Sequence, residues 1–315
     1  MDAKVSVVLA TYNGEKFLPD QLASLVSQAR KADETIVFDD CSEDATGQML
    51  RTFEMENTGV RLHLNEKNLG FRKNFHEALR ACSGDLIFLC DQDDLWMPDK
   101  IEKMVDIMER NREINLLSCN YTRLLPDGNE LAHSVFSSRF RKLRKGSGGD
   151  VPLYQVTATS NLLDIPLPGC CYCVRRSFWE RCDRYWMEEC PHDAVLWRYA
   201  ALEDSVWIVD LPLVKWRKHE TSAWKTETGS PWDRQEALKW RRAEIRDLKE
   251  MGAFAEKEKV SEAYRKCIER NLRFSMLRER FYRTRNPFSA LALLRYLDLY
   301  PSAKSWGKEW MIAFH

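Results

Sequence analysis

Strand-like and helix-like segments alternate along the first 125 residues, and this alternation constrains the fold more than any other feature. Short apolar, β-branched runs are separated by segments whose apolar residues recur at helical spacing. We expect strands at Lys4–Ala10, Glu34–Phe38, Val60–Leu64, Asp85–Cys90 and Asn115–Tyr121. We expect helices at Gly14–Ala29, Asp44–Glu56, Arg72–Ala81 and Pro98–Asn111. This order predicts an α/β fold with a mainly parallel sheet and helices on both faces.

The rest of the chain is less regular. Arg139–Asp150 is basic and rich in glycine, which predicts a loop, either a solvated charge run or a flap over phosphates or an acceptor. Further elements are expected at Pro168–Val174 and Ser205–Val209 as strands, and at Ser177–Tyr185 and Ala194–Ala201 as helices. From about Pro231 the chain lacks strand signals and predicts long helices, broken at Gly252 and at Asn286-Pro287. We therefore expect a domain at 1–230 and a helical region at 231–315.

Composition excludes several classes of protein. The 48 Lys+Arg balance the 48 Asp+Glu, so the global charge indicates neither nucleic-acid nor membrane binding. No apolar stretch approaches the roughly 20 residues that cross a bilayer. The chain runs into its first strand with no signal peptide, and its ten Cys lack the spacing of a disulfide framework. We expect a folded cytoplasmic protein whose cysteines are reduced.

Polar clusters follow several of the predicted strands. They are Thr11-Tyr12-Asn13, Asp39-Asp40-Cys41-Ser42, Asn68-Leu69-Gly70 and Asp91-Gln92-Asp93-Asp94. In parallel α/β sheets, ligands bind beyond the carboxyl ends of the strands. The convergence of four such clusters predicts a binding site at this edge.

The densest cluster, Asp91–Asp94, carries three carboxylates with no fixed cation nearby in the sequence. Such a group is costly unless positive charge compensates it. A divalent cation that carries a diphosphate would do so, because Mg²⁺ takes one or two protein carboxylates and completes its shell with phosphate oxygens and water. The alternative is that these residues, Asp94 in particular, cap the following helix.

These motifs resemble those of the family 2 glycosyltransferases over roughly residues 4–224. The resemblance rests on Val5–Gly14, Val37–Asp44, Asn68–Phe71 and Asp91–Trp96, and on Pro168-Gly169-Cys170, His192-Asp193 and Arg217-Lys218-His219-Glu220. It implies the GT-A fold and an inverting mechanism. The Asp-Gln-Asp-Asp-Leu-Trp form is similar to the bacterial rhamnosyltransferase subgroup.

The resemblance implies roles for individual residues. Asp93 is expected to bind Mg²⁺ or Mn²⁺ with help from Asp91 and His219, and Asp193 to act as the catalytic base. The expected nucleotide-sugar residues are Thr11, Tyr12, Asn13, Asp39, Asn68, Lys73, Asp91 and Arg217. Asp39 would read the ring N–H of uracil or thymine. His192, Gly169 and Cys170 are expected at the acceptor site, where Cys170-Cys171 stands in place of the commoner Thr-Met pair.

The donor implied is a dTDP-linked deoxysugar such as rhamnose, and the acceptor a free or lipid-linked saccharide of a cell-surface polysaccharide. A UDP-hexose or UDP-hexosamine donor, or nucleotide-sugar binding without turnover, remains an alternative. Residues 231–285 hold sixteen Lys/Arg against ten Asp/Glu, and Trp306, Trp310 and Phe314 follow. We expect these helices to pack on the catalytic domain or on a partner subunit, as in a homodimer. The alternative is peripheral contact with the inner face of a membrane.

Overall fold

The computed structural model describes residues 2–132, 143–148, 151–158, 161–163, 165, 167–188, 190–219, 233–300 and 303–314. These residues divide into two compact units. The first comprises residues 1–157, 165–184 and 191–219, and the second comprises 158–164, 185–190 and 220–315. The helical region thus includes two short segments from earlier in the chain.

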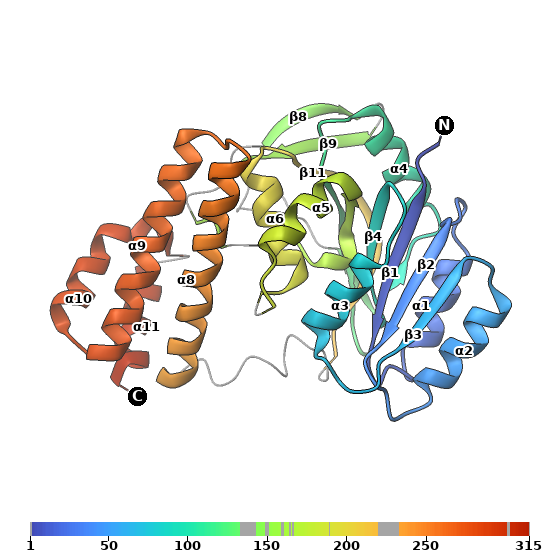
Figure 1. Ribbon diagram of the computed structural model, residues 1–315, viewed down its shortest axis with the longest axis horizontal. Coiled ribbons are helices and arrows are strands. Elements are labelled where there is room, and N and C mark those ends of the chain that lie inside the picture. The colour runs from blue at the N-terminus through green and yellow to red at the C-terminus, as the bar shows by residue number, and fades with distance from the viewer. Residues whose placement is uncertain are drawn as a thin grey trace. The chain divides into compact units, whose positions relative to one another are not determined.

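The first unit contains one mixed sheet with helices on both faces (Figure 1). Its strands are β1 (Val5–Thr11), β2 (Glu34–Asp39), β3 (Val60–Leu64), β4 (Leu86–Asp91), β5 (Leu95–Trp96), β6 (Leu116–Leu124), β7 (Glu130–Ala132), β8 (Leu143–Gly148), β9 (Val151–Val156), β10 (Tyr172–Arg175) and β11 (Val206–Arg217). Its helices are α1 (Leu18–Val26), α2 (Thr46–Glu56), α3 (Phe71–Arg80), α4 (Lys100–Arg110), α5 (Arg176–Cys182) and α6 (His192–Leu202).

The strand order is β3-β2-β1-β4-β10-β6-β11-β9-β8, with β5 paired to β11 and β7 to β6. Strands β1 to β4 pair in parallel, as do β6 and β11. Strand β10 is antiparallel to both β4 and β6, so β6 and β11 point the same way as β4. The predicted α/β class is therefore confirmed, and the carboxyl ends of β1, β2, β4, β6 and β11 meet at one edge.

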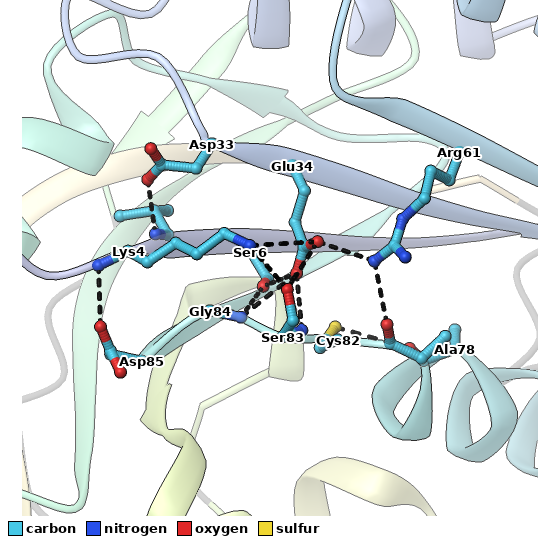
Figure 2. A network of polar contacts seen from close by, with 12 residues as sticks. Lys4, Ser6, Asp33, Glu34, Arg61, Ala78, Cys82, Ser83, Gly84 and Asp85 are labelled. Carbon is cyan, nitrogen blue, oxygen red and sulfur yellow. Dashed lines mark hydrogen bonds and ion pairs between the residues drawn. The ribbon is translucent and has the colours of Figure 1, made fainter.

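At the opposite edge, Glu34 holds the beginnings of four strands together (Figure 2). Its side chain is buried and accepts hydrogen bonds from Ser6 Oγ at 2.5 Å, from Ser83 N at 2.6 Å and from Arg61 Nη2 at 2.7 Å. Burial alone would raise the pKa of Glu34, but the bonds from Ser6 and Ser83 and the charge of Arg61 outweigh it, so the pKa is lowered. This ionised carboxylate fixes the register of the parallel strands.

Two expectations for the regular elements are wrong. Residues 143–148, expected to be loop, form β8, because a hairpin with β9 supplies backbone hydrogen bonds that local sequence does not reveal. The rest of the expected loop (139–142 and 149–150) lies outside the described residues. Gly252 does not break its helix, because one glycine costs only about 1 kcal/mol and packing overrides it. The predicted break at Asn286-Pro287 is confirmed, with Asn286 capping the next helix.

The second unit consists mainly of helices. They are α8 (Arg234–Lys257), α9 (Glu262–Thr284), α10 (Pro287–Ala292), the 3-10 segment η4 (Leu293–Leu299) and α11 (Ala303–Phe314). Helices α8 and α9 lie side by side, and α10 and α11 pack against α9 (Figure 1). Trp306 and Trp310 pack on the apolar core of this unit, whereas Phe314 is exposed. No helix among the described residues is long and apolar enough to cross a bilayer.

Candidate active site

The acidic residues 91–94 form the turn between β4 and β5. Gln92 fixes this turn to the end of β1: its Oε1 accepts from Tyr12 N at 2.9 Å, and its Nε2 donates to Tyr12 O at 3.0 Å. A Cβ on Gly14 would lie 2.3 Å from Gln92 Oε1, so the glycine makes room for this amide. The two polar clusters after β1 and β4 therefore form one structure.

Asp93 and His219, expected to share a metal ion, lie together. His219 Nε2 is 2.5 Å from Asp93 Oδ2, and the two side chains are 14% and 19% exposed. Asp93 and His219 are 126 positions apart in the chain. They meet because Trp96 in β5 pairs with Val214 in β11. A carboxylate and an imidazole here provide an oxygen and a nitrogen ligand that a divalent transition-metal ion can use.

Arg217 holds the acidic turn in place. Its backbone N donates to Asp94 Oδ1 at 2.9 Å, its Nε donates to Asp93 O at 2.9 Å, and its Nη2 donates to Asp20 Oδ2 at 3.0 Å. The guanidinium also lies 4.8 Å from the centre of the Phe17 ring. Asp94 therefore binds the end of β11. It does not cap α4, because Asp99 occupies the N-cap position of that helix.

Asp91 and Asp94 lie close to the thiol of Cys170, with one ligand atom from each residue within 4.8 Å of the others. Burial, followed by the negative charges of Asp93 and Asp193, raises the pKa of Asp91 to about 7. Burial and the same kind of repulsion raise the pKa of Asp94 well above its usual value. Burial likewise raises the pKa of the Cys170 thiol. Burial and repulsion among these acidic groups thus outweigh the positive charge near the turn.

One cation that sequence analysis missed is Lys100. It is fully buried, its Nζ donates to Cys170 O at 2.5 Å and lies 3.5 Å from the centre of the Trp96 ring. Its charge acts on Asp91 and partly offsets the rise in that pKa. The sequence motif indicated no fixed cation beside the acidic residues, whereas the structure places Lys100 there. A signal existed: a lysine in the first turn of a predicted helix is opposed by the helix dipole, so it needs another partner.

The expected base, Asp193, lies in the first turn of α6. Asp193 Oδ1 accepts from Ala194 N at 2.7 Å, and its charge acts on Asp91. This confirms that a helix begins at this position, where the dipole favours an ionised carboxylate. A Cβ on Gly169 would lie 2.8 Å from His192 Nε2 and 3.1 Å from Asp193 Cβ, so the residue at this turn must be small.

His192 is 7% exposed and stacks on Phe75, with ring centres 3.6 Å apart and planes at 7°. Burial lowers its pKa to about 4, so the ring is neutral near pH 7. Neither ring nitrogen has a hydrogen-bond partner among the described residues. Because unpaired polar atoms are costly in a protein interior, this ring is prepared for a partner such as a substrate hydroxyl or water.

The expected base-binding residues surround the end of β2. Asp39 is buried; its Oδ1 accepts from Thr11 Oγ1 at 2.8 Å and from Ser42 Oγ at 2.6 Å, and its Oδ2 accepts from Ser42 N at 2.9 Å. Asn13 N donates to Ser42 Oγ at 2.8 Å. Tyr12 is 45% exposed beside them, so its ring is accessible to a ligand.

Asn68 and Lys73 lie on the next loop and helix. Asn68 is exposed, and its Oδ1 accepts from Gly70 N at 3.0 Å. Buried Asp40 holds the same loop by accepting from Leu69 N at 2.7 Å and Gly70 N at 2.9 Å. Lys73 is partly exposed in the first turn of α3. Asp40 therefore supports the loop that carries Asn68, and Lys73 lies on the helix that follows.

Known proteins resemble this chain in sequence and in fold. Residues 6–160 match the family described as glycosyl transferase family 2. The putative teichuronic acid biosynthesis glycosyltransferase TuaG of Bacillus subtilis is 30% identical over 127 residues, 40% of this chain and 50% of TuaG. The dTDP-rhamnosyl transferase RfbG of Shigella flexneri is 25% identical over 229 residues, 68% of this chain and 72% of RfbG. The chain thus spans about half the length of TuaG and more of RfbG.

Among solved structures, S. aureus TarS 1-349 in complex with UDP-GlcNAc superposes with a TM-score of 0.66 at 17% identity. The alignment covers 99% of this chain and 89% of that one. Identity this low supports the fold alone. Residues 6–160 thus match glycosyl transferase family 2, and the chain as a whole has the GT-A fold with a helical C-terminal region.

Proposed function

We propose that the protein is an inverting glycosyltransferase that moves a sugar from a nucleoside-diphosphate donor to a saccharide acceptor in cell-surface polysaccharide synthesis. The observation that carries this proposal is the convergence of the Asp91–Asp94 turn with Asp193 at the carboxyl edge of a family 2 domain. Sugar transfer needs a neutralised diphosphate, a proton acceptor for the incoming hydroxyl and a fixed nucleotide, and this edge offers side chains for each.

A divalent cation, Mg²⁺ or Mn²⁺, fits the donor groups on this edge. Asp93 offers a carboxylate oxygen and His219, 2.5 Å from it, offers a ring nitrogen, a pair that suits Mn²⁺. Asp91, which the structure groups with Asp94 and Cys170, is proposed to add a second carboxylate. When bound, the ion would neutralise charge that develops on the leaving diphosphate. The bonds from Arg217 and Gln92 hold the turn rigid for this role.

Asp39 is the residue we expect to select the base. In the contacts among the described residues, Oδ2 accepts only from Ser42 N, so a second lone pair can accept the ring N–H of uracil or thymine. Thr11 and Asn13 hold this carboxylate and Ser42 in place, and the exposed Tyr12 ring offers a surface for the base or ribose. Asn68, Lys73 and Arg217 are proposed to complete the donor site.

Asp193 is proposed to take the proton from the acceptor hydroxyl while that oxygen attacks the anomeric carbon from the face opposite the diphosphate. One displacement of this kind inverts the anomeric centre. Neutral His192, with two unpaired ring nitrogens, is suited to hydrogen-bond the acceptor beside it. Gly169 and Cys170 shape the same wall of the site.

We propose dTDP-rhamnose as the donor, because the similarity to RfbG, a dTDP-rhamnosyl transferase, covers 68% of this chain. A UDP-linked hexose or hexosamine is the second candidate, which the fold shared with TarS, crystallised with UDP-GlcNAc, favours. The acceptor is proposed to be a saccharide, free or attached to a lipid.

The test has two stages. Calorimetry with Mn²⁺ compares dTDP, UDP, CDP and GDP; dTDP and UDP should bind at least tenfold more tightly, because a site that pairs the imide rejects bases that leave it unpaired. Equal affinities would refute the role of Asp39. Product analysis with dTDP-rhamnose and UDP-sugars then identifies the donor. Binding without transfer or donor hydrolysis would reduce the protein to a nucleotide-sugar-binding protein.

A further inference from the structure

Cys170, Asp91 and Asp94 bring one thiol and two carboxylates together. A ligand atom from each lies within 4.8 Å of the other two. The three residues come from the end of β4, the residue before β5, and the short 3-10 turn Gly169–Cys171, so separate elements anchor them. Cys170 and Asp94 are fully buried, while Asp91 is partly exposed. The cluster thus has a closed interior side and one side open to solvent.

Two observations indicate that this cluster suits a cation. Asp94 is 0% exposed, its Oδ2 has no donor with ordinary hydrogen-bond geometry among the described residues, and the neighbouring Cys170 thiol, a weak donor, interacts with its carboxylate. A buried carboxylate oxygen without a donor or a cation is costly. The second observation is the nature of the donors, since sulfur beside two carboxylate oxygens is a set that zinc accepts.

We propose that Cys170, Asp91 and Asp94 bind a thiophilic divalent transition-metal ion such as Zn²⁺, at a second metal site that shares Asp91 with the proposed catalytic ion. Tetrahedral Zn²⁺ has bonds of about 2.0–2.3 Å, so its ligands lie about 3.5 Å apart. The three atoms would have to approach one another by little more than about 1 Å. The fourth position stays open toward solvent on the side of Asp91.

Lys100 makes the charge balance favourable. Zn²⁺ with one thiolate and two carboxylates carries one net negative charge, and the ammonium of buried Lys100 lies beside the cluster, bonded to Cys170 O. The combined site is therefore neutral, which lowers the cost of burying it. Binding exchanges the proton of the thiol, and any carboxyl proton, for the metal ion.

Because the two proposed ions share Asp91, the second ion should affect sugar transfer, an expectation that rests on the proposed function. An ion held by Cys170, Asp91 and Asp94 removes Asp91 from the ion at Asp93 and adds positive charge beside it. We expect micromolar Zn²⁺ to inhibit transfer supported by Mg²⁺, and the Cys170→Ser variant to be less sensitive. The binding test itself needs no turnover.

The test uses the 315-residue chain, which is freed of metal and kept reduced with a phosphine. The protein is then titrated with Co²⁺, a spectroscopic substitute for Zn²⁺. A cobalt–thiolate bond gives a near-ultraviolet charge-transfer band, which Zn²⁺ should then bleach by displacement. Cys170→Ser should remove the band and weaken Zn²⁺ binding by more than the roughly 10–100-fold that is lost when a residue hydrogen-bonded to a metal ligand is replaced. The matched controls Cys119→Ser and Cys171→Ser, in the same buried cluster, should keep the band.

Further variants separate this site from the catalytic one. Asp94→Asn keeps the thiol and should lower Co²⁺ affinity at least tenfold. This variant tests the site if circular dichroism shows that Cys170→Ser does not fold. Asp93→Ala should abolish transfer and keep the band. Absence of a band in the unmodified protein, its survival in Cys170→Ser, or its loss in Asp93→Ala would overturn the proposal. A band without any transfer activity would instead refute the proposed function alone.

Discussion

At the scale of single residues, the site depends on which carboxylates are ionised and which are not. Asp193 lies in the first turn of α6, where the dipole stabilises its charge, whereas Asp91 lies among other carboxylates, which raises its pKa to about 7. A base must be ionised before it can accept a proton, so the raised pKa of Asp91 makes that residue the poorer candidate for the base. This difference separates the proposed base from the residues proposed for the metal ion.

We predict that Asp193→Asn lowers the rate of transfer roughly 10²–10⁴-fold, the usual effect of losing a general base, with donor affinity almost unchanged. Single-turnover kinetics and calorimetry of dTDP binding measure the two quantities. Asp204→Asn, on the turn after α6, is the matched control and should behave like the unmodified enzyme. Loss of donor binding in step with the rate would assign Asp193 to the nucleotide site, and a product of retained configuration would refute inversion.

Lys100 gives the second prediction at this scale. Replacing it by Met keeps the length of the stem over Trp96 and removes the ammonium beside Asp91 and Cys170. The free energy of unfolding should fall by about 3–5 kcal/mol, since removing one partner leaves a buried charge uncompensated. Urea denaturation measures it. Lys103→Met, on the exposed side of α4, should change stability by less than about 0.5 kcal/mol, and equal effects would refute the role of Lys100.

At the scale of elements, the sheet is held by polar groups at one edge and carries the site at the other. Ser6 in β1, Glu34 in β2, Arg61 in β3 and Ser83 before β4 form one network at the beginnings of four parallel strands. The carboxyl ends of β1, β2 and β4 are then aligned, and the loops that follow them carry the expected ligands. The stability of this edge therefore supports the geometry of the site.

This network predicts a pH dependence. The pKa of Glu34 is lowered from 4.5, so its contribution is complete above that pH and is lost as the pH falls through the lower folded pKa. We expect Glu34→Gln to reduce the free energy of unfolding by about 1.5–3 kcal/mol at pH 7 and by clearly less below pH 4. Chemical denaturation across this range tests it, with exposed Glu56→Gln as the control. If the loss of stability in Glu34→Gln did not vary with pH, the lowered pKa assigned to Glu34 would be contradicted.

At the scale of the whole molecule, ligand binding should raise the free energy of unfolding. A ligand that binds only the folded state at 100 times its Kd adds about 2.7 kcal/mol, which corresponds to several degrees in Tm for a chain of this size. We predict such a rise with dTDP and Mn²⁺ together and a smaller one with either alone. Asp93→Ala should lose the part that depends on metal, as should the unmodified protein in excess chelator. An equal rise with and without metal would refute a metal-dependent donor site.

Local sequence patterns determined the alternating elements of the first 125 residues, the polar clusters at strand ends and the helix that begins at Asp193, because periodicity, caps and turns act over a few residues. Other features depended on contacts between distant residues. These are the insertion of β10 between β4 and β6, the strand at 143–148 and the uninterrupted helix through Gly252.

The tertiary structure alone decided how the site is balanced electrically. The antiparallel β10 is preceded by the turn that brings Cys170 to Asp91 and Asp94, and the packing of α4 buries Lys100 beside them. Charge interactions act through space over several ångströms and ignore separation along the chain, so sequence spacing could identify the carboxylates but not their partners. The physical reason is that a residue's type sets the chemistry it offers, whereas its neighbours in the fold set its charge state and its partners.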